Sequence, residues 1–266
     1  KIPENVSSIG HDAFKSNSIK EIHIPSKVTD EIEGAPWGAT SATVYWQEVV
    51  KVEPYAFNPT TNTIVRYFGN GGDLVIPSVI SIAGVNYDVL HIGKEAFLNV
   101  TNVTSVEIPD HIQTIGKGAF SKSFATSYVN DCQLKKVIIG NGVTTIPEDA
   151  FDGSSRLEEV QMGSNVEVIS DGAFAYAKSL KEIHLPNTLK IIGANAFDSA
   201  LSLTTINIPD SVEEIGDSSF YRSGITEIHI PSKVTDEISN APWGAGNAIV
   251  YWKGVEQIGD YIFDSN

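Results

Sequence analysis

A stretch of thirteen residues from Ile208 to Phe220 reads I-P-D-S-V-E-E-I-G-D-S-S-F, and its pattern returns along most of the chain. The final Phe is the clearest marker, because phenylalanines recur at a fixed step. The step is 23 residues for every neighbouring pair except one, where it is 31. The series runs through Phe97, Phe120, Phe151, Phe174, Phe197 and Phe220. A fixed period of this length indicates a repeat array, in which every repeat forms the same structural unit.

The repeat unit is L-x-x-I-x-I-P-x-x-V-x-x-I-G-x-x-A-F, followed by about five polar or small residues. In one copy, Ile183 and Leu185 share one face of an extended segment, and Glu182 and His184 share the other. This alternation predicts a strand that is buried on one face and hydrated on the other. The Pro that follows lacks a backbone donor, so the strand ends there. Val and Ile-Gly predict a second short extended segment whose Gly permits a bend, and Ala-Phe predicts a tight turn or a single helical turn.

A single 23-residue coil is too small to be stable, because its ordering costs roughly 1.5 kcal/mol per residue. The coils must therefore stack, with each residue lying about 4.8 Å from its counterpart in the next coil. Stacking predicts a solenoid whose interior is built from ladders of like residues.

Composition limits the classes of partner. The chain of 266 residues has 33 acidic and 18 basic residues, a net charge of −15 and a pI near 4.7. We expect no nucleic-acid partner, because nucleic-acid affinity depends on neutralising phosphates. We also expect no membrane insertion by this segment, because no apolar run approaches the roughly 18 to 20 residues that span a bilayer. The strong negative charge predicts that a partner presents a basic or neutral patch.

The regular pattern is interrupted twice. An insertion of eight residues within Ser121 to Cys132 stretches one repeat, and we expect it to bulge as a loop. The segment 47–97 predicts an irregular opening unit, with a hairpin-type turn signal from Phe68 to Asp73 between two β-rich runs.

A longer period is present as well. Ser18 to Trp46 and Gly224 to Trp252 match at 22 of 29 positions, at an offset of 206 residues. We interpret residues 1–266 as one continuous solenoid that holds one full module, 47–252, and parts of two others. Residues 1–46 would end a preceding module, and 253–266 would begin a further one.

The I-P, I-G and A-F elements at fixed spacing resemble the BspA-type, or treponemal-type, leucine-rich repeat, and the likeness covers nearly the whole chain. The resemblance implies a leucine-rich-repeat solenoid, a right-handed β/α superhelix that is mostly β, with a parallel sheet on its concave face. It also implies a bacterial or protist protein that is secreted or attached to the cell surface, where adhesion is the usual proposal. The Cys often found shortly after A-F in this family is absent from most coils here.

Catalytic and metal-binding patterns are absent from the sequence. It contains no H-E-x-x-H, G-x-S-x-G or Walker A motif and only one cysteine, Cys132. His184 and His229 occupy the same strand position two coils apart, so we expect roughly 10 Å between them. A shared zinc needs nitrogens within about 4 Å, so we expect no metal site there. We therefore expect no enzyme and no cofactor.

The hydrated face of the strands is the candidate binding surface. Its two outward positions in each coil form what we call the polar strip: Ser105/Glu107, Lys136/Ile138, Glu159/Gln161, Glu182/His184, Thr205/Asn207 and Glu227/His229. Any one of these side chains is more simply a solvated strand residue, but concave repeat surfaces commonly bind partners. The candidate partner-binding residues are Glu159, Gln161, Glu182, His184, Thr205, Asn207, Glu227 and His229.

Other conspicuous residues have a simpler explanation in the core. Trp37 and Trp243 replace the repeat Phe in register, so we expect them in the core, whereas Trp46 and Trp252 are less certain. Cys132 is most simply a small buried residue.

Three functions are compatible with these patterns. The leading one is a non-enzymatic, monomeric surface or secreted protein that binds a protein or glycan through the polar strip. The second is a passive stalk that spaces another domain from the cell. The third is an accessory to an enzyme, or an enzyme with a pocket near the insertion.

Overall fold

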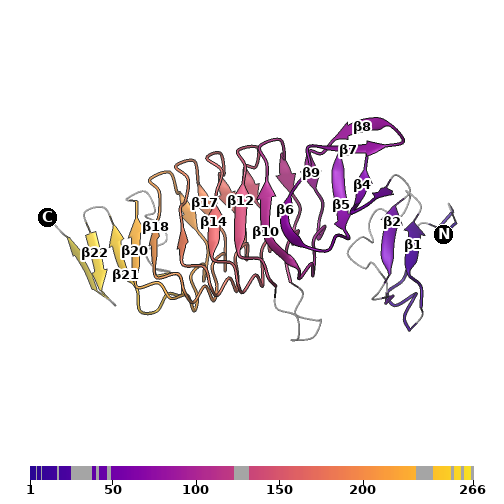
Figure 1. Cartoon of the computed structure of the whole chain (residues 1–266). Helices are drawn as coiled ribbons and strands as arrows, with labels where there is room; N and C mark the ends of the chain where they lie inside the picture. Colours follow the sequence, from indigo (N-terminus) through magenta and orange to yellow (C-terminus); the bar gives the residue numbers. More distant parts are fainter. Residues whose placement is uncertain are drawn as a thin grey trace.

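The chain winds into an elongated stack of coils with its two termini at opposite ends (Figure 1). The computed structural model describes residues 1–3, 5–6, 8–16, 18–24, 38–39, 42–46, 49–122, 132–231, 242–252, 255–258 and 261–264. These residues contain 23 β-strands, joined by turns, and no α-helix. The solenoid built from parallel sheets is therefore confirmed, and the Ala-Phe segments form turns.

The first extended segment of each coil forms a strand, and these strands lie side by side and in parallel along one side of the stack. One sheet has the order β16-β14-β12-β10-β6, and β18 of the next sheet contacts β16. The parallel row continues through β18-β20-β21, and β22 and β23 then add antiparallel strands. The bounds are β6 Gly72–Val75, β10 Val103–Ile108, β12 Lys136–Ile139, β14 Glu159–Gln161, β16 Glu182–Ile183, β18 Thr205–Asn207, β20 Glu227–Ile230, β21 Ile249–Trp252, β22 Val255–Ile258 and β23 Tyr261–Asp264.

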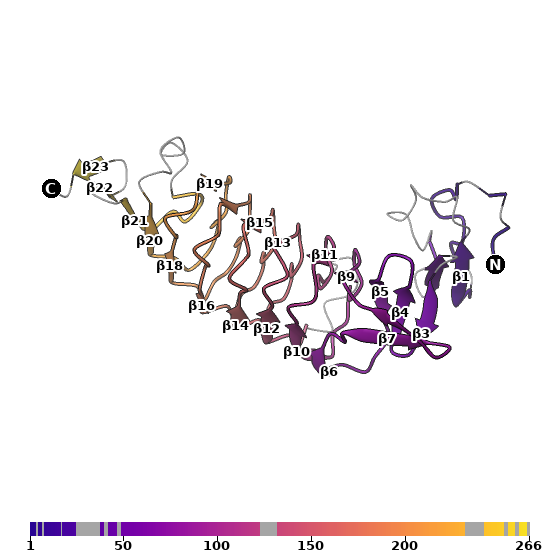
Figure 2. The same cartoon turned by 90° about the horizontal axis from the view of Figure 1, so that it is seen from above.

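The second extended segment of each coil forms two-residue strands on the opposite side of the stack (Figure 2). These strands are parallel as well, and each one buries its second residue. The bounds are β9 His91–Ile92, β11 Thr114–Ile115, β13 Thr145–Ile146, β15 Val168–Ile169, β17 Ile191–Ile192 and β19 Glu214–Ile215.

The segment 47–97 contains hairpins, but they lie away from the predicted turn at Phe68 to Asp73. β3 (Val50–Val52), β4 (Tyr55–Asn58) and β5 (Thr63–Tyr67) form an antiparallel meander that joins the short-strand side through β9. The turn after β5 is not a hairpin turn, because β5 pairs with β4 and β9 whereas β6 pairs with β10. A separate hairpin joins β7 (Val79–Ile82) to β8 (Val85–Asp88), with Ala83 and Gly84 both at positive φ.

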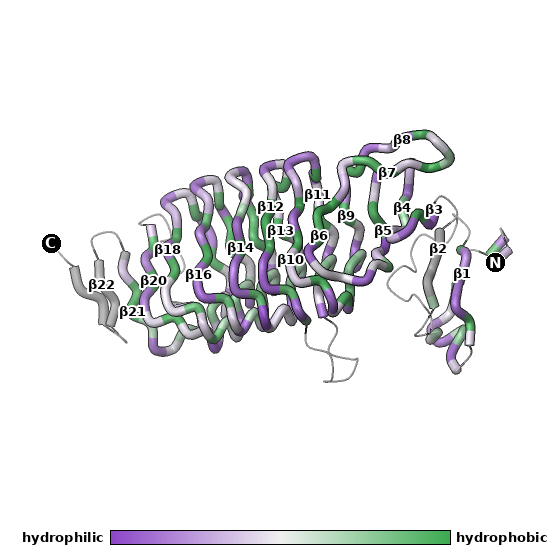
Figure 3. Tube along the Cα trace, viewed as in Figure 1, coloured by the Kyte–Doolittle hydropathy of each residue, from purple (hydrophilic) through white to green (hydrophobic). Residues whose placement is uncertain are grey.

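The repeat phenylalanines form one continuous stack inside the solenoid. Ring centroids from Phe97 to Phe220 are 4.7, 5.3, 5.4, 5.6 and 5.9 Å apart, with interplanar angles of 17° or less. The core of buried residues extends from Tyr55 to Val250. Figure 3 shows the matching alternation of hydrophobic and hydrophilic segments around each coil. The predicted ladder of like residues is therefore confirmed.

The Gly that follows the second strand has a different role from the one expected. Gly116 and Gly193 are not among the residues at positive φ. A Cβ on Gly116 would lie 2.3 Å from the backbone nitrogen of Lys94, and one on Gly193 would lie 2.5 Å from that of Asp171. The repeat requires Gly because successive backbones approach closely there, and not because the chain needs a bend.

The two ends of the described chain pair their strands alike. β1 (Glu21–Ile24) and β2 (Thr43–Trp46) are parallel, with Glu21 opposite Thr43, and β20 and β21 repeat this register with Glu227 opposite Ile249. Residues at the β1 end form a smaller core around Ile9, Ile22, Ile24 and Ala39. Most of the predicted insertion loop, and Trp37, lie outside the described residues.

Candidate functional site

Strand pairing brings the outward residues of successive coils into two rows, one ending at β16 and one beginning at β18, and β16 contacts β18 between them. Lys136 is opposite Ser105 on one side and Glu159 on the other, and Ile138 is opposite both Glu107 and Gln161. Further along, Glu182 is opposite Glu159, Glu227 is opposite Thr205, and His229 is opposite Asn207. All eight candidate partner-binding residues are exposed. The polar strip therefore exists as a surface, whereas its binding role stays a prediction.

Charges within the strip are partly balanced by local contacts. Lys136 Nζ lies 3.0 Å from Glu159 Oε1, and Gln161 Nε2 donates a hydrogen bond of 2.6 Å to the same oxygen. These two hydrogen bonds, first from Lys136 and then from Gln161, lower the pKa of the Glu159 carboxyl. Glu159 and Glu182 are directly opposite, which is unfavourable for two like charges, so Lys136 offsets a local repulsion.

Glu and His two residues apart recur along the array, on one strand in β20 and with His184 just after the end of β16. Glu182 Oε1 is 3.1 Å from His184 Nε2, and Glu227 Oε2 is 3.9 Å from His229 Nε2. His184 is 86% exposed, so water solvates this pair. Each pair offers a donor and an acceptor to a ligand, but neither has a nucleophile or a third orienting group of the kind a hydrolytic site uses.

Metal binding finds no support among the described residues. No cluster of three or more His, Cys, Asp or Glu side chains in them is arranged to hold an ion. Within the same residues, no helix is long and apolar enough to cross a membrane.

Carboxylates also gather in the turns next to the Phe stack. Burial, with Asp149 and Asp198 adding to it, raises the pKa of Asp152 to about 7, against the lowering effect of the Gly153 N–H. The pKa of Asp149 is raised as well, chiefly by burial. This cluster affects stability more directly than binding, because the charged form is disfavoured in the folded chain.

Two residues that extend the strip were missed by the sequence analysis. Tyr251 lies opposite His229 on β21, with ring centroids 4.9 Å apart and an interplanar angle of 13°. At the other end, Asp73 on β6 accepts hydrogen bonds from the hydroxyls of Thr104 and Ser105 at 2.8 and 2.7 Å, with Ser105 contributing most to the lowering of its pKa. A sequence pattern that marks Tyr251 was present, because Val-Tyr-Trp ends both copies of the 29-residue match.

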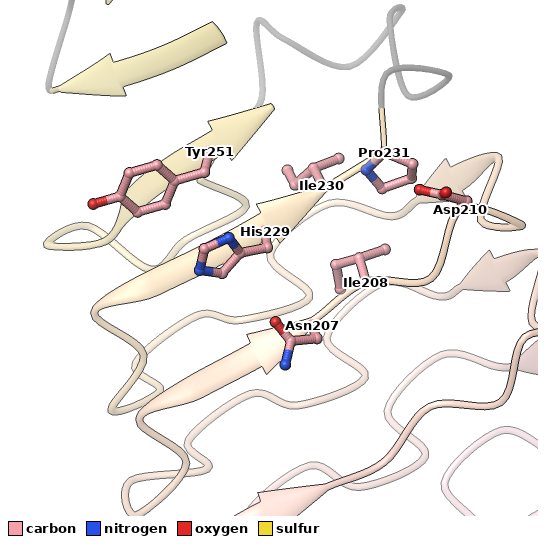
Figure 4. Close-up of a pocket in the computed structure, with 7 residues that line it drawn as sticks. All are labelled: Asn207, Ile208, Asp210, His229, Ile230, Pro231 and Tyr251. Carbon is pink, nitrogen blue, oxygen red and sulfur yellow. The ribbon is translucent and has the colours of Figure 1, made fainter. Parts of the chain in front are cut away.

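A shallow hollow of about 260 Å³ lies at the β21 end of the strip (Figure 4). Its polar lining comes from Asn207, Asp210, His229 and Tyr251. Its apolar lining comes from Ile208, Ile230 and Pro231, all buried. These residues come from three neighbouring strands and from the turns that follow two of them.

Two other residues behave as core residues. Trp243 is 1% exposed and meets Phe220 edge-on at 6.4 Å, so it ends the Phe stack as expected. Cys132 is buried, as expected. The side chains of Trp46 and Trp252 lie outside the described structure.

The comparison with protein families agrees with this geometry. The model of the BspA type leucine rich repeat region matches in six copies, over residues 1–65, 79–130 and 125–241. The chain belongs to the BspA-type leucine-rich repeat family. The family resemblance drawn from the I-P, I-G and A-F elements is thereby confirmed.

Solved structures similar to this BspA-type chain are bacterial leucine-rich repeat proteins. One from Eubacterium ventriosum is 23% identical, with a TM-score of 0.61, over 90% of this chain and 68% of its own. One from T. pallidum is 22% identical, with a TM-score of 0.46, over 75% of this chain and 79% of its own. One from Bacteroides ovatus is 22% identical, with a TM-score of 0.42, over 71% of this chain and 59% of its own. These identities show a shared fold alone. The comparison with curated proteins found no match.

Proposed function

We propose that this chain is a non-enzymatic repeat protein of the bacterial cell surface or secretome, and that its polar strip binds a protein or glycan partner. The observation that carries the proposal is the exposed row from Glu159 to His229, which lies on parallel strands that pair from β14 to β16 and from β18 to β20, with β16 in contact with β18. Binding residues on a regular scaffold are already positioned, so little entropy is lost when a partner binds. Location at the surface follows the family resemblance.

The charge of the strip indicates the kind of partner. Glu159, Glu182 and Glu227 are exposed, and the chain as a whole carries a net charge of −15. A partner surface that is basic or neutral complements this strip, and the association rate should fall as salt rises.

The test uses charge reversal on the two sides of the stack. Glu182→Lys changes the strip, and Glu214→Lys changes an exposed Glu of the short strand β19 on the other side. Both variants are assayed on a printed glycan array and on a panel of immobilised purified extracellular proteins. Ligands of the unaltered chain should lose binding to Glu182→Lys and keep it for Glu214→Lys, with equal melting temperatures. Equal binding by both variants would contradict the proposal.

A passive stalk is the second candidate, because the buried core extends from Tyr55 to Val250 and makes a stiff rod. If the chain is a stalk, strip variants change nothing, and removal of whole coils alters function in proportion to the length lost.

A further inference from the structure

The hollow at the β21 end of the polar strip differs in chemistry from the rest of the strip. Asn207, His229 and Tyr251 line a recess at this end of the strip (Figure 4). The volume of about 260 Å³ is below the range of drug-sized pockets, so it suits one small ring rather than an extended peptide.

The lining of the hollow alternates polar groups with apolar surface. The Asn207 amide offers a donor and an acceptor, the Asp210 carboxylate accepts, and the Tyr251 hydroxyl does either. Ile208 and Ile230 are 7% and 4% exposed, and Pro231 is buried beside them. The nearly parallel rings of His229 and Tyr251 add aromatic surface with polar tips. A ligand with hydroxyls around its rim and C–H groups on its faces matches this lining.

The charges of the described lining disfavour anions. None of the described residues that line the hollow is Lys or Arg, so these residues offer a phosphate, sulfate or carboxylate no cationic partner. An organic cation would meet Asp210 and the aromatic rings, so choline is the probe that separates this alternative from a neutral sugar. A neutral polyhydroxylated ring uses all four polar groups.

Recurrence within the chain is the second observation. His23 is opposite Tyr45 in β1–β2, as His229 is opposite Tyr251 in β20–β21. Both pairs lie in the 29-residue match with 22 identities, whereas the 17 residues before it keep only six identities at this offset, all at positions of the repeat pattern. The His is retained within this segment together with polar neighbours such as Ser26, Lys27 and Thr29. The first copy has Lys1 where the second has Asn207, so the two copies should differ in affinity.

We propose that the hollow lined by Asn207, His229 and Tyr251 is a binding subsite for a neutral sugar ring, such as a terminal pyranose of a glycan. The subsite rests on the proposed function, because it makes the end of the polar strip the part that recognises a glycan. The ring lies against the aromatic surface of His229 and Tyr251, and its hydroxyls hydrogen-bond to Asn207 and Asp210.

The experiment is saturation-transfer NMR on the full chain with separate probes. The neutral probes are the methyl pyranosides of glucose, galactose, mannose and N-acetylglucosamine. The charged probes are glucuronate, inorganic phosphate and choline. At least one neutral glycoside should bind, and Tyr251→Ser should weaken it by about tenfold, the effect of roughly 1.4 kcal/mol of lost contacts. Asn207→Ala, at an exposed position, should weaken it severalfold and serves if Tyr251→Ser fails to fold.

The matched control is Tyr221→Ser, the same change at a tyrosine that is 42% exposed and outside the hollow. It should leave glycoside binding unchanged. Three results would each overturn the sugar subsite. They are binding of no neutral glycoside, equal glycoside binding by Tyr251→Ser and Tyr221→Ser, and binding of choline alone. Loss of partner binding in Glu182→Lys without any glycoside binding would leave the proposed function standing and remove only the subsite. Glycoside binding that depends on Tyr251, together with unchanged partner binding by Glu182→Lys, would leave the subsite standing and remove the proposed function of the strip.

Discussion

The Phe stack makes a quantitative prediction about how the coils depend on one another. Phe174 is fully buried, and its ring lies 5.4 Å from that of Phe151 and 5.6 Å from that of Phe197, with interplanar angles of 6° and 10°. Phe174→Ala removes the ring from both neighbours at once. Coils contact mainly their neighbours, so no distant contact compensates for the loss.

The expected loss follows from burial and from stacking. Replacing a fully buried Phe by Ala destabilises proteins by about 3–5 kcal/mol, which includes the cavity left behind. Phe174→Leu keeps most of the buried volume but loses two stacked pairs of about 0.5–1.5 kcal/mol each. We therefore expect about 4 kcal/mol for the Ala variant and about 2 kcal/mol for the Leu variant.

The assay is urea unfolding followed by circular dichroism and by tryptophan fluorescence. The tryptophans are Trp37, Trp46, Trp243 and Trp252, so fluorescence reports on the two ends of the sequence, and circular dichroism reports on the whole array. If the circular dichroism and fluorescence transitions of Phe174→Ala occur at different urea concentrations, the coils unfold in blocks. Tyr221→Ala, at an exposed position, should change stability by less than about 0.5 kcal/mol. A Phe174→Ala variant within about 1 kcal/mol of the unaltered chain would refute the stacked core as the source of stability.

Three further perturbations test other contacts. The pKa of Asp152 in the folded chain is raised to about 7. The contribution of this carboxyl to stability is therefore fully present below pH 4 and is lost as the pH rises through 7. Asp152→Asn should therefore gain roughly 1–2 kcal/mol over the unaltered chain at pH 8, after discounting for solvent, and nothing at pH 4; a gain equal at both pH values would refute it. Gly193→Ala places a Cβ 2.5 Å from Asp171 and should destabilise by about 1–3 kcal/mol in thermal unfolding. Gly246→Ala, with open space around it, is the control and should be neutral or slightly stabilising. Lys136→Met removes the 3.0 Å ion pair with Glu159 and should change stability by less than about 1 kcal/mol, with a smaller effect at high salt.

Much of the strip was predictable, because it depends on two periods alone. Alternation within a strand separates Glu182 from Ile183, and the 23-residue step places Glu182 opposite Glu159. His229 follows Asn207 by 22 residues, and the Ile-Pro that comes directly after each of them aligns the two strands so that they lie opposite each other. The hollow was not predictable, because it depends on how far Tyr251 and the turn at Asp210 project beside the strand ends.

Turn geometry was also beyond the sequence patterns. The residue two places before the repeat Phe has positive φ at Glu95, Asp149, Asn195 and Ser218, and at Gly118 and Gly172. Residues of such different kinds share no sequence signal. Their N–H groups in five of these coils donate hydrogen bonds to the next coil instead, as from Asp149 to the carbonyl of Asp171, so the neighbour imposes the conformation.

By itself, the sequence determined that this chain is a stack of BspA-type repeats, because periodic burial of Ile, Val and Phe leaves stacking as the way to shield them. Only the tertiary structure decided where the short strands and the longer strands stand, why Gly116 and Gly193 must lack a side chain, and which exposed residues surround a recess. These features arise from contacts between coils, where the distance from one backbone to the next is set by the whole stack and by no single repeat.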